Sequence, residues 1–301
     1  MQPAKGISRL QYHLWLGLIS ITGLKCAFFP FLFSVFPWFF IGQVIRTDAA
    51  DIVTLNLSPS AGKPLFPSSV VSNDIDFIKS TDASVAYCIA FQKTGRAKMV
   101  DKRHNRLLTL NVSFFVVRFA DGTRVGLWVH PDLGPRAVIL HYARHVARGL
   151  SHLPSAMRET LSHVVIHHGD ETAFAEDEEH FFVLYHKNID TRLQQHDLEE
   201  TIFHESVHAT LDDRWSRDPA WQFAQAADGA FITHYAKAHP NREDLAETAL
   251  FSYVLLTTPE RFSDSLVAKI RQLVPNRLAF FKRLFLDGQP LLRQIRKTES
   301  C

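Results

Sequence analysis

The sequence predicts an α+β domain in which a small β part precedes a mostly helical half. A hairpin is indicated where the Val- and Phe-rich run 107–119 is followed by an Ala-Asp-Gly turn at 120–122 and a second apolar run at 124–130. From about His196 onward the apolar spacing is almost wholly helical. No internal repeat, low-complexity tract or linker divides residues 51–301, so we treat them as one domain.

The remaining elements follow from local patterns. Residues 51–106 mix turn residues with short apolar runs, which indicates short strands and loops. Residues 137–150 have helical periodicity, whereas 164–168 and 181–186 are typical of short strands. The chain ends in two predicted helices, which we expect to pack the domain without a catalytic group: 261–273 and 277–286.

Net charge and cysteine content indicate little about partners. The formal charge is +2, from 33 basic and 31 acidic residues, so the overall charge gives no reason to expect a nucleic-acid partner or an acidic substrate. The three cysteines, Cys26, Cys88 and Cys301, form no CxxC pair and predict neither a disulfide framework nor a thiolate metal site. Any metal ion must therefore be bound by histidines and carboxylates.

The N-terminal segment differs from the rest of the chain. Residues 26–45 carry no charge and are long enough to span a bilayer. Basic residues precede this run, which predicts a cytoplasmic N-terminus and an exported remainder. Pro30 and Pro37 argue against a buried helix of a water-soluble domain. We expect residues 1–50 to be a signal sequence or a membrane anchor, and both cleavage and retention fit the sequence.

The strongest chemical motif is His-Glu-x-x-His at 204–208. Asp197 is a plausible N-cap for the helix that carries it. Residues four apart on a helix lie about 40° apart in azimuth and roughly 6 Å apart along the axis, so His204 and His208 can bind one ion. Glu205 then lies beside the metal without binding it, as a general base for a metal-activated water does.

An amphipathic helix with two incidental histidines is the alternative to a metal site. The apolar side chains around the motif argue against it, because they bury the helix and make imidazoles without partners costly. These side chains are Leu198, Ile202, Phe203, Val207 and Leu211.

A third ligand must come from another part of the chain. Leu211 and Arg214 occupy the positions where an extended HExxHxxGxxH motif needs Gly and His. A second helix is predicted just after Pro240, with Glu243 and Glu247 one turn apart on one face. Glu243 can bind the metal, and Glu247 can then accept the free N–H of a ligating histidine. An acidic first turn exposed to solvent is the alternative.

Asp244 is a weaker candidate than Glu243 for the third ligand. It lies about 100° round the helix from Glu243, so it cannot share a face with both Glu243 and Glu247.

Over roughly residues 196 to 255 the chain resembles zinc peptidases of the gluzincin type, among them the catalytic domain of anthrax lethal factor and uncharacterised exported bacterial relatives. The resemblance rests on HESVH at 204–208 followed by Asp212, then Tyr235, Glu243 and Glu247 in that order. It implies a zincin-like domain, Zn²⁺, hydrolysis of peptide bonds and Glu243 as third ligand. It also implies that Tyr235 stabilises the oxyanion of the tetrahedral intermediate. His234 is a competitor for this role, because small loop differences could exchange neighbouring residues, and a core aromatic with a satisfied hydroxyl is the alternative for Tyr235.

Substrate binding is expected by addition of a strand to the sheet. Zincin clefts commonly bind substrate in this way, and 181–186 is the nearest candidate edge strand. The partner would be a peptide or protein, with a membrane involved only through residues 1–50 and the domain placed in the periplasm or outside the cell.

Other histidines are expected to lie outside the site. His141, His145 and His152 have helical spacing, but Arg144 adjoins His145, so we predict a solvated helix face. His163, His167 and His168 flank a strand, where His167 and His168 should point to opposite faces.

Two other functions fit the same ligands. One is a non-catalytic zinc-binding or interaction module, which Glu205 argues against because a structural site needs no general base and is usually closed by a fourth ligand. The other is a metal amidase that acts on cell-wall material, which export would suit.

Overall fold

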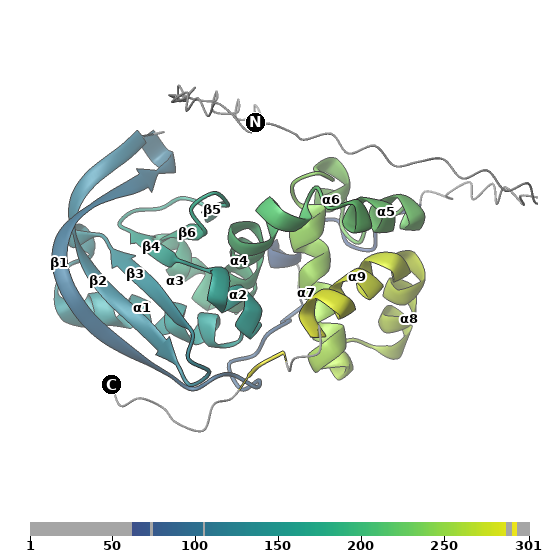
Figure 1. Cartoon of the computed structure of the whole chain (residues 1–301), viewed down its shortest axis with the longest axis horizontal. Coiled ribbons are helices and arrows are strands. Elements are labelled where there is room, and N and C mark those ends of the chain that lie inside the picture. The colour runs from purple at the N-terminus through teal and green to yellow at the C-terminus, as the bar shows by residue number, and fades with distance from the viewer. Residues whose placement is uncertain (1–61, 73–74, 105, 287–290, 294–301) are drawn as a thin grey trace, which may run out of the picture. The chain divides into compact units, whose positions relative to one another are not determined.

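The computed structural model describes residues 62–72, 75–104, 106–286 and 291–293. Within these residues it confirms the α+β class, with a six-stranded mixed sheet whose strand order is β1-β2-β3-β4-β6-β5 (Figure 1). The strands are β1 (Tyr87–Asp101), β2 (Arg106–Phe119), β3 (Arg124–Val129), β4 (His163–His167), β5 (Phe174–Glu176) and β6 (Phe181–Tyr185). The helices are α1 (Arg136–Ser151), α2 (Ser155–Thr160), α3 (His186–Gln195), α4 (Leu198–Trp215), α5 (Pro219–Asp228), α6 (His234–Ala238), α7 (Asp244–Thr257), α8 (Asp264–Leu273) and α9 (Pro275–Leu286).

The predicted hairpin is confirmed as β2 and β3, which pair antiparallel from Ser113↔Val129 to Arg118↔Arg124. The predicted helix at 137–150 and the strands at 164–168 and 181–186 correspond to α1, β4 and β6. β3, β4 and β6 are parallel to one another, and α1 and α2 form the crossover that a parallel β3–β4 pair requires.

The expectation of short strands and loops before the hairpin is wrong, because β1 is a 15-residue strand. It pairs antiparallel with β2 from Tyr87↔Phe119 to Asp101↔Arg106, with an irregularity between Phe91 and Lys93. The pairing continues beyond the residues of β2 that contact β3, and Figure 1 shows the two strands as a long bent arm. Much of this arm is exposed, so its sequence lacks the apolar runs by which strands are usually detected.

The two faces of the sheet bury different side chains, as strand alternation requires. In β4, Val164 and Ile166 join the main core under α1 and α4, whereas Val165 joins a smaller cluster on the other face. The smaller cluster is completed by the arm and by β6, with these buried members: Met99, Val112, Phe181, Val183 and Tyr185.

α4 passes through the main core, and most of its residues are buried. A glycine allows α1 to pack closely on it, because a Cβ at Gly149 would lie 2.4 Å from Cδ1 of Ile202. α7 packs against α4, and α9 packs against α5 and α7. The predicted tail helices at 261–273 and 277–286 appear as α8 and α9, and their buried side chains include Ile270, Phe280 and Phe281.

Three other predictions concern domains and cysteines. Residues Asn56–Cys301 form one compact unit, and the domain bounds 51–301 stay a prediction. The predicted signal sequence or anchor at 1–50 lies outside the described residues. No helix in the described part of the chain has the length and apolar character to cross a membrane. Cys88 is disulfide-bonded, which the cysteine spacing did not predict.

Candidate metal centre

The His-Glu-x-x-His motif lies on α4, as predicted. Asp197 is at the N-cap position, but its side chain makes no capping hydrogen bond and instead accepts one from Nη1 of Arg192 at 2.7 Å. Burial on several sides fixes this helix in the core, so the side chains of the motif have little freedom to move. His204 and Glu205 are both buried, and Glu205 retains 9% exposure.

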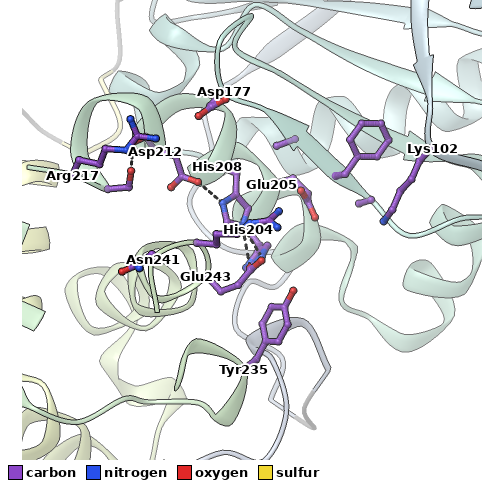
Figure 2. Close-up of a pocket in the computed structure, with 15 residues that line it drawn as sticks. Lys102, Asp177, His204, Glu205, His208, Asp212, Arg217, Tyr235, Asn241 and Glu243 are labelled. Carbon is purple, nitrogen blue, oxygen red and sulfur yellow. Dashed lines mark hydrogen bonds and ion pairs between the residues drawn. The ribbon is translucent and has the colours of Figure 1, made fainter. Parts of the chain in front are cut away.

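Three ligand atoms from α4 and the start of α7 converge on one point (Figure 2). Nε2 of His204 lies 3.1 Å from Nε2 of His208, and these two atoms lie 3.4 and 3.3 Å from Oε2 of Glu243. Ligands on a tetrahedral zinc ion, with bonds of about 2.0–2.1 Å, are separated by about 3.3–3.4 Å. The spacing therefore fits three ligands of one such ion, and no other group of this kind occurs among the described residues.

The hydrogen bond of His208 explains why a cation fits this point. Nδ1 of His208 lies 2.7 Å from Oδ2 of Asp212, so the ring donates from Nδ1 to the carboxylate. The neutral ring then presents the lone pair of Nε2 towards Glu243, which is itself an acceptor. Two acceptors at 3.3 Å need a proton or a metal ion between them. Asp212 thus fixes the orientation of the His208 ring, and its position four residues after His208 on one helix is a signal that the sequence carries.

Glu247 lies beside His204, but it does not make the predicted hydrogen bond. Its Oε1 is 3.7 Å from Nδ1 of His204, and that nitrogen has no hydrogen-bond partner among the described residues. The carboxylate of Glu247 instead accepts hydrogen bonds from Oγ of Ser69 at 2.5 Å and from the backbone N–H of Val70 at 3.0 Å. Glu247 therefore holds the segment before β1 against α7, at the back of the His204 ring.

The electrostatics of His208 and Glu243 favour positive charge on the imidazole and negative charge on the carboxylate. Burial lowers the pKa of His208, but its hydrogen bonds with Asp212 and Glu243 outweigh burial and raise that pKa well above its usual value. Burial raises the pKa of Glu243, yet the hydrogen bonds and charges of His204 and His208 hold it far below its usual range. Burial also raises the pKa of Glu205, and the two histidines only partly oppose this.

Glu243 is the residue immediately before α7, not part of its first turn as predicted, because α7 begins at Asp244. Asp244 points away from the three ligands. It accepts hydrogen bonds from Nε of Arg277 and Nε2 of Gln225, both at 2.8 Å, and is fully buried. The preference for Glu243 over Asp244 as the ligand is therefore consistent with the structure.

Tyr235 on α6 lies at the same cavity. The residue is 38% exposed, and its side chain points into the cavity in Figure 2. Burial and the negative charge of Glu243 raise the pKa of Tyr235, so its hydroxyl stays protonated and can donate a hydrogen bond. His234, the competing residue, is exposed and does not line the cavity.

The cavity at the three ligands has a volume of about 370 Å³. Along one side runs β5, the edge strand of the sheet, whose Phe174 and Ala175 line the cavity. The prediction that 181–186 forms this edge is wrong, because β6 lies between β4 and β5. The three-residue β5 was too short to be recognised in the sequence. Sequence patterns also gave no indication that Lys102, about a hundred residues away from the motif, lines the same cavity.

The other histidines behave partly as predicted. His167 is buried and His168 is exposed, as alternation required. His141 is exposed on α1, but the predicted solvated face does not include His152, which is buried with Nδ1 at 3.3 Å from the carbonyl oxygen of Ala83.

The chain matches no known family, curated protein or solved structure.

Proposed function

We propose that this chain is a zinc-dependent peptidase with a zincin-like domain at 51–301, in which His204, His208 and Glu243 hold Zn²⁺. The observation that carries the proposal is the convergence of two imidazole nitrogens and one carboxylate oxygen at tetrahedral spacing beside the buried Glu205. Two histidines with one glutamate form the ligand set of catalytic zinc sites that keep an open position.

Bound zinc would supply a Lewis acid and lower the pKa of a water molecule. Glu205 acts as the general base that takes a proton from this water and returns it to the leaving nitrogen of the substrate. Burial raises the pKa of Glu205 above its usual value, which strengthens the carboxylate as a base. Tyr235 donates a hydrogen bond to the oxyanion that develops on the attacked carbonyl.

The substrate peptide lies along β5. The edge of this strand that faces away from β6 pairs with no other described strand, lies next to the cavity, and can pair with the main chain of an extended peptide. Main-chain pairing positions the scissile bond irrespective of the peptide sequence, so it favours a peptide or protein substrate over a small molecule.

We also propose export of the domain. The support is the uncharged run at 26–45 and the basic residues that precede it. N-terminal sequencing of the mature protein would show whether residues 1–50 are removed.

Metal analysis and a peptide-library digest of the full chain test the proposal. We expect one zinc per chain and cleavage of library peptides. Glu205→Gln should keep the zinc and lower kcat by about 10³-fold, because the loss of a general base typically costs 10²–10⁴. A chain that binds no zinc, or cleavage that survives Glu205→Gln, would contradict the proposal.

A further inference from the structure

The rim of the cavity carries three exposed cations that are not neutralised. Lys102, Arg217 and Arg242 line the cavity, and none of them forms an ion pair with a carboxylate in the described part of the chain. Three acids that also line the cavity form no ion pair with these cations. Glu243 faces the two histidines, Asp212 accepts a hydrogen bond from His208, and Glu205 is buried. Among the described residues that line the cavity, the only other acid is the exposed Asp177, so the exposed lining residues carry more positive than negative charge.

Lys102 is held in place by a buried network at the end of the β1–β2 arm. Asp101 is fully buried and accepts hydrogen bonds from Nε of Arg103 at 2.9 Å and from the hydroxyl of Tyr185 at 3.1 Å. Burial opposes ionisation of Asp101, but these bonds and the charge of Arg103 lower its pKa to about 2. The backbone N–H of Lys102 donates to the same Tyr185 hydroxyl at 2.9 Å. The backbone of Lys102 is therefore fixed.

The ammonium group of Lys102 lies at the strand where the substrate is expected. Nζ donates to the neutral Oγ1 of Thr172 at 2.6 Å and lies 5.9 Å from the ring centroid of Phe174 in β5. Figure 2 shows Lys102 and Arg217 at opposite sides of the His204–Glu205 centre. Arg217 follows α4, and Arg242 directly precedes Glu243.

We infer that the cavity selects acidic peptides, with Lys102 binding a substrate carboxylate beside β5, and Arg217 and Arg242 binding carboxylates on the side of α4 and α7. This inference rests on the proposed function, because it assigns the substrate of the same site. The net charge of +2 did not suggest an acidic substrate, since balanced totals conceal a local excess of one sign. Charge complementarity of this kind contributes mainly specificity and a faster association rate.

Binding to a variant that cannot hydrolyse its ligand tests the inference separately from the proposed function. Fluorescence anisotropy would compare zinc-loaded and zinc-free Glu205→Gln full chain with labelled peptides of one length. Three peptides carry Glu on one side of a neutral centre, on the other side, or on both sides. Matching peptides carry Lys at the same positions. We expect the doubly acidic peptide to bind at least tenfold more tightly than the basic one at low salt, with the difference shrinking as salt screens the charges.

Charge-reversal variants would identify the cations responsible. Lys102→Glu should reduce the preference for Glu on one side only, and Arg217→Glu should do so for the other side. Lys98→Glu, on the same arm but outside the cavity, is the control for the first variant, and Lys237→Glu on α6 is the control for the second. Both controls should leave the preference unchanged.

The outcomes separate the two proposals. Equal binding of acidic and basic peptides, or equal effects of Lys102→Glu and Lys98→Glu, would overturn the inference even if wild-type protein cleaves peptides. Selective binding of acidic peptides by the Glu205→Gln variant, with no cleavage of peptides by the wild-type protein, would support the inference and contradict the proposed hydrolysis.

Discussion

The molecule contains two pairs of histidines four residues apart on a helix, and only one pair forms a candidate metal centre. The rings of His204 and His208 on α4 have centroids 4.8 Å apart at an interplanar angle of 78°. The rings of His141 and His145 on α1 have centroids 4.6 Å apart at 73°. Helical spacing alone therefore produces nearly the same ring geometry in both places.

The two pairs differ in the charged side chains that surround them. Glu243 approaches both rings of the α4 pair, and Asp212 orients His208. At the α1 pair, Nη2 of Arg148 lies 3.3 Å from Nδ1 of His145, and its positive charge opposes a metal ion. Burial, His141 and Arg148 lower the pKa of His145, whereas carboxylates raise that of His208. The comparison teaches that the charge of the neighbours, not the spacing, separates a ligand pair from a surface pair.

The largest expected effect is loss of the metal. Glu243→Ala removes the carboxylate ligand and should reduce zinc from one equivalent per chain to almost none, as measured by atomic emission after dialysis. His145→Ala in the other pair should keep the full equivalent. Equal zinc content in the two variants would show that Glu243 does not distinguish the α4 pair from the α1 pair as a metal site.

A smaller effect, on catalysis and not on zinc content, is expected when the tyrosine beside the α4 pair is changed. Tyr235→Phe should keep zinc and lower kcat for peptide cleavage by about 10²-fold, because it removes one donor to the oxyanion. Tyr142→Phe is the matched control, since the Tyr142 ring lies 5.2 Å from that of His141 and its hydroxyl bonds Asp190 at 3.1 Å. Steady-state rates that fall equally in both variants would count against a role for Tyr235.

The carboxylate that orients His208 should tune affinity without being essential. Asp212→Asn should weaken zinc binding by about 10–100-fold in competition with a chelator, the usual cost of losing an outer partner of a ligand. Asp190→Asn, near the other pair, should leave zinc affinity unchanged. The comparison would fail if Asp190→Asn weakened binding as much as Asp212→Asn.

The smallest effect is a difference in how stability depends on pH in the metal-free chain. The folded pKa of His208 is raised, so its contribution is complete below the unfolded pKa of about 6.5 and is lost as pH rises through the folded pKa. The folded pKa of His145 is lowered, so its contribution is lost as pH falls below about 6.5.

Denaturant unfolding of wild type and of each His→Gln variant would measure these contributions. The stability advantage of wild type over His208→Gln should shrink with rising pH, by at most about 1.4 kcal/mol per pH unit. The advantage over His145→Gln should shrink with falling pH. The same sign for both variants would contradict the assigned surroundings.

Residues close together in the chain made much of this protein predictable. Apolar spacing predicted the hairpin, α1, β4 and β6, and the residue types at 204–208 were enough to recognise the His-Glu-x-x-His motif. The position of Glu243 at the start of a helix was predictable from the short acidic run after Pro240, whereas its role as a ligand stays a prediction. Asp212 could have been assigned as well, since four residues separate it from His208.

Tertiary structure decided the features that depend on distant segments. β6 became interior because three residues, too few to show a period, pair along its outer edge as β5. Ser69 and the backbone N–H of Val70 donate hydrogen bonds to Glu247, whereas the helix pattern predicted a histidine as the donor. Lys102 reached the metal cavity because Tyr185 and Asp101 hold the end of the arm. Sequence periodicity reports which face of an element is buried, but only packing decides what that face meets.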